Sequence, residues 1–441
     1  MKNTTKKVNS SFRDPSGEVY WCDNRLYRSI ADSYIDTYHT LMSSGLYYEL
    51  LSKGLIIPHN ETHHADIIQP DIIPFISYPY EWSFGAYKDA ALATLEIQKI
   101  ALEHGMVLKD ASAYNIQFNH GYPLLIDTLS FEEYQEGTPW RAYRQFCQHF
   151  LAPLAVMSIV DPRLSRLMTL FIDGIPLELA SRLLPKYKFN FGILTHIHSQ
   201  VVAQHNIHKV VKLTMHKTAL LGLLDSLTSA VNSLGLRPRK GWSDYQHNTS
   251  YNDVAATAKT EIVRSLIEHS HPKTVWDLGA NDGSYSALAV DDKCTVIAFD
   301  SDPYCVEDCY KHYRQDILPL VLDLTNPSPG IGWACQERMS LSERGPADLV
   351  MALALVHHLA ISNNTPFSMI ADWFSKLSKW LIIEFVPKDD LQAQKLLASR
   401  VDIFDNYTQE NFELEFGKYY RQIERKDVSQ SCRSIYLFQV K

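Results

Sequence analysis

The sequence predicts a chain of two parts, an α+β domain over residues 1–235 and an α/β domain over residues 236–441. Its length of 441 residues, at about 150 residues per domain, indicates two or three domains. Apolar types make up 46% and charged types 21%, which is typical of a globular protein. From about residue 236 onward, β-type and helical segments alternate regularly, and this favours parallel strands joined by crossover helices.

Charge and cysteine content exclude several functional classes. The 42 basic and 50 acidic residues give a net charge of −8, without the basic excess of a nucleic-acid-binding protein. The seven cysteines show no CxxC spacing, so neither a disulfide framework nor a zinc ribbon is expected. The longest apolar run, Leu349–Val356, is too short to span a membrane, and the N-terminus has no apolar signal segment. We therefore expect a reduced, cytoplasmic protein without a nucleic-acid partner or a membrane span.

The first part is expected to contain short strands, a long helix and a hairpin. A basic connector punctuated by proline and glycine, Leu236–Trp242, marks its end. The elements are, in order, a strand-like opening, the hinge strand Pro74–Tyr80, the helix Ala86–His104, a hairpin turning at Asn119–Gly121, and helical segments over Thr138–Leu234.

One motif of the first part has the pattern Asp110, four residues, Asn115, a hairpin and then Asp127. This pattern resembles the catalytic loop and metal-binding aspartate of protein-kinase-like phosphotransferases, especially the aminoglycoside and choline kinase type. The resemblance implies a two-lobed kinase-like domain that uses ATP and magnesium. Asp110 would orient the acceptor hydroxyl, while Asn115 and Asp127 would hold the metal.

The first part also departs from that family. Lys109 stands before Asp110, where the family commonly has arginine or glycine, and the first 60 residues contain neither a glycine-rich loop nor a VAIK-type lysine. Arg28 is the candidate to replace that lysine, with Glu49 on a following helix. The structural alternative is that Asp110 and Asn115 only pin a tight loop through side-chain-to-backbone hydrogen bonds.

The second part is expected to open with the helix Asp253–His269, whose apolar residues share one face. Five near-continuous apolar runs follow, as expected of parallel strands that are covered on both faces. They are Lys273–Leu278, Thr295–Asp300, Ile317–Leu324, Ala347–Leu353 and Trp380–Val386. An antiparallel hairpin, Tyr419–Arg425 with Arg433–Val440, should close one sheet edge.

Acidic residues recur at the predicted carboxyl ends of the first three strands. Asp277 precedes a glycine-containing turn, Asp300 lies 23 residues later, and Asp323 another 23 residues on. A glycine turn between a strand and a helix lets the backbone approach a ligand closely. A carboxylate at the second strand end can accept hydrogen bonds from both ribose hydroxyls of an adenosine cofactor.

This arrangement resembles the class I S-adenosylmethionine-dependent methyltransferases, which carry a Rossmann-like sheet and the motif acidic-x-Gly-x-Gly-x-Gly. The stretch from VWDLGAND to IIEFVPKDD is also similar to bacterial methyltransferase-domain proteins that include rhizobial nodulation proteins. The motif departs from the family at one position, where Asn281 replaces a glycine, although asparagine tolerates a left-handed backbone. An NAD-binding domain, which would want GxGxxG, and an α/β domain with incidental aspartates are the alternatives.

The resemblance implies a cofactor role for each residue of the motif. Asp277 opens the motif, and Gly279, Asn281 and Gly283 form the turn, with the two glycines flanking the methionine portion of the cofactor. Asp300 would hold the ribose. Asp323 and Leu324 would contact the adenine.

Three further side chains are catalytic candidates. His357 and His358 follow the fourth strand, where a histidine is able to act as general base, although one of them could instead cap a helix and the other pack in the core. Glu384 ends the fifth strand, as a base, an acceptor-orienting group or a solvated strand end. Methyl transfer also proceeds by positioning alone when the acceptor is already nucleophilic.

The sequence thus predicts transfer of a methyl group from S-adenosylmethionine to a small molecule, glycan or natural-product intermediate. The first alternative is a bifunctional kinase-methyltransferase. The second is an interaction protein in which a pseudo-kinase scaffold carries the methyltransferase domain.

Overall fold

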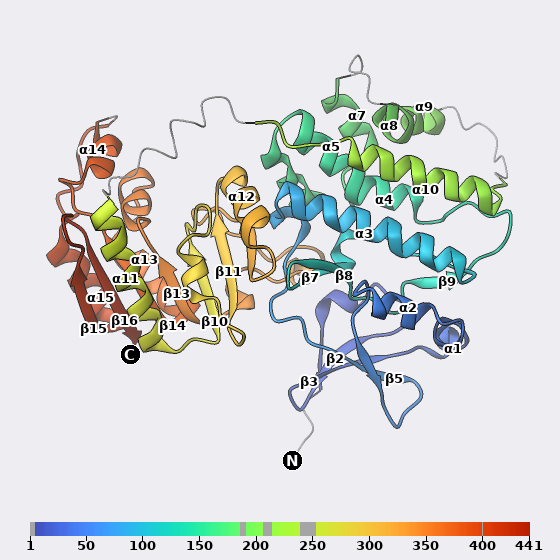
Figure 1. Cartoon of the computed structure of the whole chain (residues 1–441), viewed down its shortest axis with the longest axis horizontal. Coiled ribbons are helices and arrows are strands. Elements are labelled where there is room, and N and C mark those ends of the chain that lie inside the picture. Colours follow the sequence, from blue (N-terminus) through green and yellow to red (C-terminus); the bar gives the residue numbers. More distant parts are fainter. Residues whose placement is uncertain (1–4, 186–190, 206–213, 239–252, 399) are drawn as a thin grey trace. The chain divides into compact units, whose positions relative to one another are not determined.

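The computed structural model describes residues 5–185, 191–205, 214–238, 253–398 and 400–441 (Figure 1). The chain divides into two compact units: unit 1 comprises Met1–Arg237 and Gly330–Arg338, and unit 2 comprises Pro238–Pro329 and Met339–Lys441. Residues 239–242 of the predicted connector lie outside the described residues. Within the described ranges, no helix has both the length and the apolarity needed to cross a membrane. All seven cysteines are free thiols.

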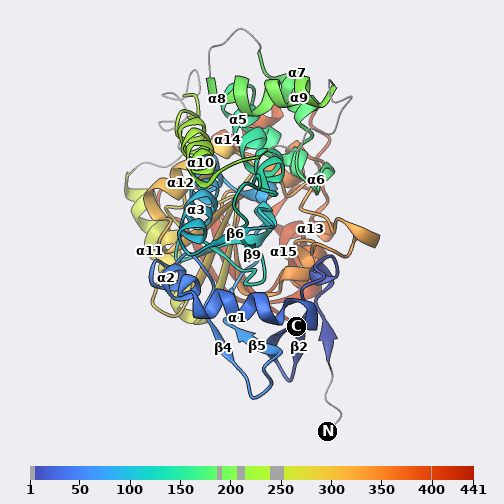
Figure 2. The same ribbon diagram turned by 90° about the vertical axis from the view of Figure 1, so that its right-hand side faces the viewer.

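Unit 1 opens with a five-stranded antiparallel sheet in the order β1-β2-β3-β5-β4. Helices α1 (Ile35–Ser43) and α2 (Leu46–Ser52) follow β3, and α1 lies beside this sheet (Figures 1 and 2). The strands are β1 (Lys6–Lys7), β2 (Val19–Cys22), β3 (Arg25–Ser29), β4 (His59–Glu61) and β5 (Ile67–Pro70).

The rest of unit 1 is mainly helical and contains two small antiparallel strand pairs. Helix α3 (Phe84–Glu103) begins after Ser83, whose hydroxyl caps it by accepting a hydrogen bond from the Ala86 N–H at 3.1 Å. The strand pairs are β6 (Met106–Leu108) with β9 (Phe131–Glu133), and β7 (Ile116–Asn119) with β8 (Tyr122–Leu125). The remaining helices are α4 (Tyr143–Phe146), α5 (Ala152–Ile159), α6 (Leu167–Leu170), α7 (Leu177–Leu183), α8 (Phe191–Ile193), α9 (Ser199–His205) and α10 (Lys217–Asn232).

The predicted hinge strand at Pro74–Tyr80 is wrong. This segment is irregular and ends in the 3₁₀ turn Pro79–Glu81. Prolines at positions 74 and 79 remove two backbone N–H groups that a paired strand would need, which explains the difference. The long helix and the hairpin around Asn119–Gly121 are confirmed, because α3 and the β7–β8 turn lie where the sequence placed them.

Unit 2 is built on a seven-stranded sheet in the order β12-β11-β10-β13-β14-β16-β15. Its first five strands pair in parallel and its last two are antiparallel, so the predicted α/β sheet with a hairpin at one edge is confirmed. The strands are β10 (Thr274–Leu278), β11 (Thr295–Asp300), β12 (Ile317–Val321), β13 (Ala347–Ala352), β14 (Ser378–Phe385), β15 (Tyr420–Asp427) and β16 (Ser434–Val440).

Helices cover the sheet of unit 2, and apolar side chains of α11 such as Val263 and Leu266 pack into its core. Helix α12 starts where Asp302 accepts a hydrogen bond from the Tyr304 N–H at 3.0 Å and Pro303 occupies the first helical position. The helices are α11 (Asp253–Ser270), α12 (Pro303–Tyr313), α13 (Phe367–Leu377), α14 (Leu391–Leu397) and α15 (Gln409–Tyr419).

The strand order fixes where a ligand is able to bind in unit 2. Strand β10 pairs with β11 on one side and with β13 on the other, so the direction of strand progression reverses at β10. Ligands of open α/β sheets bind outside the carboxyl ends of the strands at such a reversal point. The predicted glycine turn directly follows β10 and therefore lies at this point of the sheet.

Candidate functional site

The glycine turn after β10 is tied to the end of β11. The N–H groups of Gly279 and Ala280 both donate to the carbonyl oxygen of Phe299, at 2.8 and 2.9 Å. The turn then passes through three left-handed residues, with φ values of +77° at Gly279, +53° at Asn281 and +84° at Gly283. Asparagine adopts this conformation more readily than most residues, which accounts for Asn281 at the place of a glycine.

Asp300 closes this turn from the end of β11. Its Oδ2 accepts a hydrogen bond from the Asn281 N–H at 2.9 Å, and its Oδ1 accepts one from the Asp302 N–H at 2.8 Å. Burial raises the pKa of the Asp300 carboxyl, and these backbone N–H groups oppose that shift. Because an ionised carboxylate offers about four acceptor positions, Asp300 keeps acceptor capacity for ligand hydroxyls.

Two other residues of the motif, Asp277 and Gly283, contribute to the packing of the turn. Asp277 is 1% exposed and accepts the Ser286 hydroxyl at 2.7 Å, so it is buried behind the turn. A Cβ atom at Gly283 would lie 2.4 Å from the Cys309 sulfur of α12. Glycine at position 283 is therefore required for the packing of the turn against α12.

Asp323 lies two residues beyond the end of β12, since this strand stops at Val321 rather than at the predicted Leu324. Its Oδ1 accepts hydrogen bonds from the Thr325 N–H at 2.9 Å and the Thr325 hydroxyl at 2.7 Å. Asp323 and Leu324 are both half-buried at the same edge of the sheet as Asp300.

Glu384 is fully buried, so it is not a solvated strand end. Its Oε2 accepts hydrogen bonds from Lys259 Nζ at 2.6 Å and from the Ala354 N–H at 2.8 Å. Its Oε1 accepts one from Arg433 at 3.2 Å. A carboxylate engaged by two cations is a weak proton acceptor, which disfavours Glu384 as general base.

The two candidate histidines differ in exposure although their rings lie 4.3 Å apart. His357 is 1% exposed, and its Nδ1 has no hydrogen-bond partner within the described part of the chain. Burial, followed by the neighbouring His358 and Arg433, lowers the pKa of His357 to about 3. Its imidazole is therefore neutral at pH 7 and binds a proton weakly. His358 is exposed.

The structure brings Asp110, Asn115 and Asp127 of unit 1 together. Burial raises the pKa of Asp110, the nearby negative charge of Asp127 raises it further, and a side-chain hydrogen bond from Asn115 opposes both. Asp110 Oδ1 also accepts hydrogen bonds from the Ser112 N–H at 3.0 Å and from Gln145 Nε2 at 2.7 Å. The bond to Ser112 is the local loop-pinning contact that the structural alternative expects.

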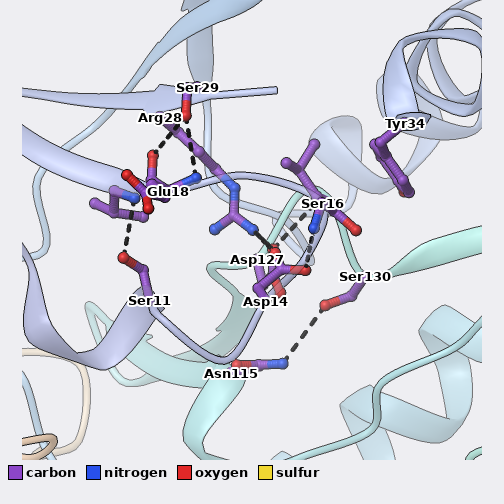
Figure 3. Close-up of polar contacts among 12 residues, drawn as sticks. Ser11, Asp14, Ser16, Glu18, Arg28, Ser29, Tyr34, Asn115, Asp127 and Ser130 are labelled. Carbon is purple, nitrogen blue, oxygen red and sulfur yellow. Dashed lines mark hydrogen bonds and ion pairs between the residues drawn. The ribbon is translucent and has the colours of Figure 1, made fainter. Parts of the chain in front are cut away.

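Arg28 pairs with one carboxylate of this cluster, Asp127, and with a second carboxylate nearby, Asp14. Its guanidinium bonds to Asp14 and lies 2.7 Å from Asp127 Oδ1, and Figure 3 shows the side chain reaching both carboxylates. Asn115 Nδ2 lies 3.5 Å from the Ser130 hydroxyl in the same view. Lys109 Nζ approaches the Ser16 hydroxyl at 2.5 Å and lies 4.2 Å from the centre of the Tyr34 ring.

The cluster does not fit a magnesium ion in this arrangement. The Arg28 guanidinium already neutralises the Asp127 oxygen that would bind the metal, and a cation at the same place would be repelled. Across the described residues, no group of three or more His, Cys, Asp or Glu side chains is arranged to hold a metal ion. Among the ion pairs of the described residues, Arg28 is paired with Asp14 and Asp127, whereas Glu49 pairs with His104 Nε2 at 2.8 Å.

Sequence reasoning missed the partners of Glu384 and Asp127. A signal existed for Lys259, because it lies four residues from both Ala255 and Val263 on the apolar face of α11, where a charged residue needs a buried partner. No local pattern marks Asp14, which is brought to Arg28 by the turn between β1 and β2.

Comparison with known proteins gives a relative for the whole chain and solved structures for part of it. The chain is 31% identical to the nodulation protein NoeA of Rhizobium meliloti (strain 1021), with 98% of this chain and 96% of that protein covered. No family model matches the chain.

Two similar solved structures each cover 45% of this chain. The N-methyltransferase NodS of Bradyrhizobium japonicum WM9, in complex with S-adenosyl-L-homocysteine, is 11% identical with a TM-score of 0.33, and 97% of it is covered. The magnesium protoporphyrin IX methyltransferase of Synechocystis PCC 6803 is 16% identical with a TM-score of 0.31, and 93% of it is covered.

Proposed function

The chain belongs to the family of the nodulation protein NoeA, and we propose that it is an S-adenosylmethionine-dependent methyltransferase. The name of that relative states no reaction, so the proposal rests on the site in unit 2. There, the carboxyl ends of β10, β11 and β12 would hold the cofactor, which supplies a methyl group on an electrophilic sulfonium. The acceptor would be a small molecule or a glycan.

The hydrogen bond between the Asn281 N–H and Asp300, at 2.9 Å, is the observation that carries the proposal. It joins the left-handed turn to the carboxylate at the next strand end, so that the turn and the Asp300 carboxylate lie next to each other at the same end of the sheet. Asp300 would accept the ribose hydroxyls, Gly279 would let the backbone approach the methionine portion, and Asp323 with Leu324 would contact the adenine.

The dinucleotide alternative is less well supported. Dinucleotide-binding sheets have six parallel strands in the order 3-2-1-4-5-6 and a GxGxxG turn. In unit 2 the antiparallel strand β16 is inserted between β14 and β15, and Asn281 stands in the turn.

The surroundings of the catalytic candidates favour a methyl transfer in which the protein only positions the reactants. Glu384 is held by two cations and His357 is buried with a low pKa, so neither is suited to remove a proton from the acceptor. An acceptor atom that is already nucleophilic needs no such base. Of the three candidates, only His358 is exposed enough to meet an acceptor directly.

Calorimetric titration of the full chain with S-adenosylhomocysteine tests the proposal. We expect binding by the unaltered chain, and at least a 10-fold weaker affinity for Asp300→Ala, because charge-assisted hydrogen bonds are lost. Asp316→Ala is the matched control, since this exposed aspartate precedes β12 at the opposite edge of the sheet. Binding of NAD in place of S-adenosylhomocysteine would refute the proposal.

For unit 1 we propose a binding or scaffold role without phosphotransfer. The ion pair of Arg28 with Asp127 supports this role, because it takes up the carboxylate that magnesium would need. ATP with magnesium should leave the thermal midpoint of the full chain unchanged, whereas a ligand that binds the native state raises it. A midpoint raised by ATP only in the presence of magnesium would favour the bifunctional alternative.

A further inference from the structure

Four buried charged side chains meet at the carboxyl end of β14 in unit 2. Lys259 comes from α11, Glu384 from β14, Asp390 from the loop before α14, and Arg433 from the residue before β16. Their side chains are at most 5% exposed. Arg433 donates to Asp390 from Nε at 2.8 Å and from Nη2 at 2.9 Å, and it donates to Glu384 Oε1 from Nη1 at 3.2 Å. The second oxygen of Glu384 accepts from Lys259. Two cations thus balance two carboxylates.

Such a network is not needed for stability alone. Replacing a buried ion pair by well-packed apolar residues is often neutral or stabilising, because desolvation of the charges offsets their attraction. The network does make one contact that apolar side chains would not make. Glu384 Oε2, the oxygen bound by Lys259, also accepts the Ala354 N–H at 2.8 Å.

Ala354 has an unusual backbone conformation at the point where Glu384 holds it. It lies two residues beyond Ala352, the last residue of β13, and has a φ of +49°. This left-handed region is unfavourable for any residue that carries a Cβ atom. The hydrogen bond to the buried carboxylate therefore stabilises a conformation that alanine would otherwise avoid.

The conformation of Ala354 sets the position of the next side chain. Leu355 packs on the cofactor turn, because a Cβ atom built on Gly279 would lie 3.2 Å from Leu355 Cδ1. Lys259 Nζ also lies 4.5 Å from the centre of the ring of Tyr285, which follows the turn two residues after Gly283. The network thus reaches the turn indirectly, through Ala354 and the side chain of Leu355.

We infer that Glu384 is a positioning residue for cofactor binding: it holds Ala354 in the left-handed conformation and so keeps Leu355 against Gly279. The inference rests on the proposed function, in which the turn at Gly279 receives the methionine portion of S-adenosylmethionine. It assigns to Lys259 and Arg433 the task of fixing the Glu384 carboxylate in place. Because Glu384 is fully buried, this assignment gives it no direct contact with cofactor or acceptor.

The test is calorimetric titration of the full chain with S-adenosylhomocysteine. Glu384→Gln should weaken binding about 10-fold, because the amide has one acceptor oxygen in place of two and is unable to serve Lys259, Arg433 and the Ala354 N–H together. Adding Ala354→Gly to Glu384→Gln should restore most of the affinity, because glycine adopts this conformation without a partner. Glu424→Gln is the matched control, since this half-buried carboxylate of β15 pairs with His269 away from the turn.

The outcomes separate the inference from the proposed function. If the unaltered chain binds no S-adenosylhomocysteine, both are overturned. If it binds and Glu384→Gln binds equally well, or if Ala354→Gly rescues nothing, only the inference is overturned. A purely structural role of Glu384 would lower the melting midpoint without this rescue of affinity.

A second pair of variants covers the case in which Glu384→Gln does not fold. With Glu384 intact, Ala354→Gly should bind S-adenosylhomocysteine as well as the unaltered chain. Ala354→Val should bind about 10-fold more weakly, because a β-branched residue is especially unfavourable at positive φ. Equal affinities of the two variants would overturn the inference.

Discussion

Replacing Arg28 by methionine tests the internal cation of unit 1. The Arg28 side chain is 9% exposed, and its partners Asp127 and Asp14 are 12% and 21% exposed. Removing one member of a buried pair destabilises a protein by about 3–5 kcal/mol, because the partner charge is left uncompensated. Since water reaches both carboxylates in part, we expect a loss of about 3 kcal/mol, at the lower end of that range.

Urea unfolding of the full chain, with hydrogen exchange to assign the transition of unit 1, measures this loss. Lys99→Met is the matched control, because Lys99 forms an exposed ion pair with Asp225 at 2.7 Å in the same unit. An exposed pair of this kind contributes less than about 1 kcal/mol. An Arg28→Met variant as stable as Lys99→Met would refute the reasoning.

Magnesium provides a second measurement on the same variant. Without Arg28, the carboxylates of Asp14 and Asp127 repel each other and become available to a divalent cation. Magnesium at 100 times its dissociation constant should then stabilise Arg28→Met by about 2.7 kcal/mol. The unaltered chain should show no such effect. Equal stabilisation of both proteins would mean that Arg28 yields to the metal, as the kinase-like alternative requires.

Two further variants test the cofactor turn. Burial raises the pKa of Asp277 from 3.8 to about 7, so its contribution to the stability of the fold is present below about pH 4 and is lost as the pH rises through 7. Asp277→Asn should flatten this fall in stability, measured by urea unfolding at several pH values. An unchanged pH profile would contradict the assignment. Gly283→Ala should destabilise unit 2 by about 1–3 kcal/mol, because the new Cβ would lie 2.4 Å from the Cys309 sulfur. Adding Cys309→Ala should recover part of this lost stability, as measured by thermal denaturation. A Gly283→Ala variant as stable as the unaltered chain would show that the turn and α12 are not packed this closely.

The sheet of unit 2 could be predicted from the sequence because its strands are covered on both faces. Buried parallel strands must be apolar almost throughout, so each strand appears as one uninterrupted run. The run Thr295–Asp300 coincides with β11, and Thr274–Leu278 of β10 falls within the predicted Lys273–Leu278. The errors lie at strand ends such as Leu322–Leu324, where two more leucines follow after the pairing with β11 has ended.

The roles of charged side chains were harder to predict, because the role of such a side chain depends on partners that are distant in sequence. Lys259 and Glu384 are 125 residues apart, and their contact depends on how α11 packs against β14. The motif around Asp110 illustrates the same limit. Its residue types and spacing match a metal site, but the sequence does not reveal that Arg28 would reach Asp127 first.

The two units hold their key carboxylates in different ways, and the chemistry that each carboxylate is able to perform differs accordingly. Asp300 is held by two backbone N–H groups, which orient the carboxylate without cancelling its charge and leave lone pairs for a ligand. Asp127 is held by a buried guanidinium, which cancels the charge that would attract a metal. A ligand at Asp300 adds hydrogen bonds to an arrangement that already exists. A metal at Asp127 would first have to break an ion pair whose loss leaves a buried cation, so ligand binding is favoured in unit 2 and metal binding is opposed in unit 1.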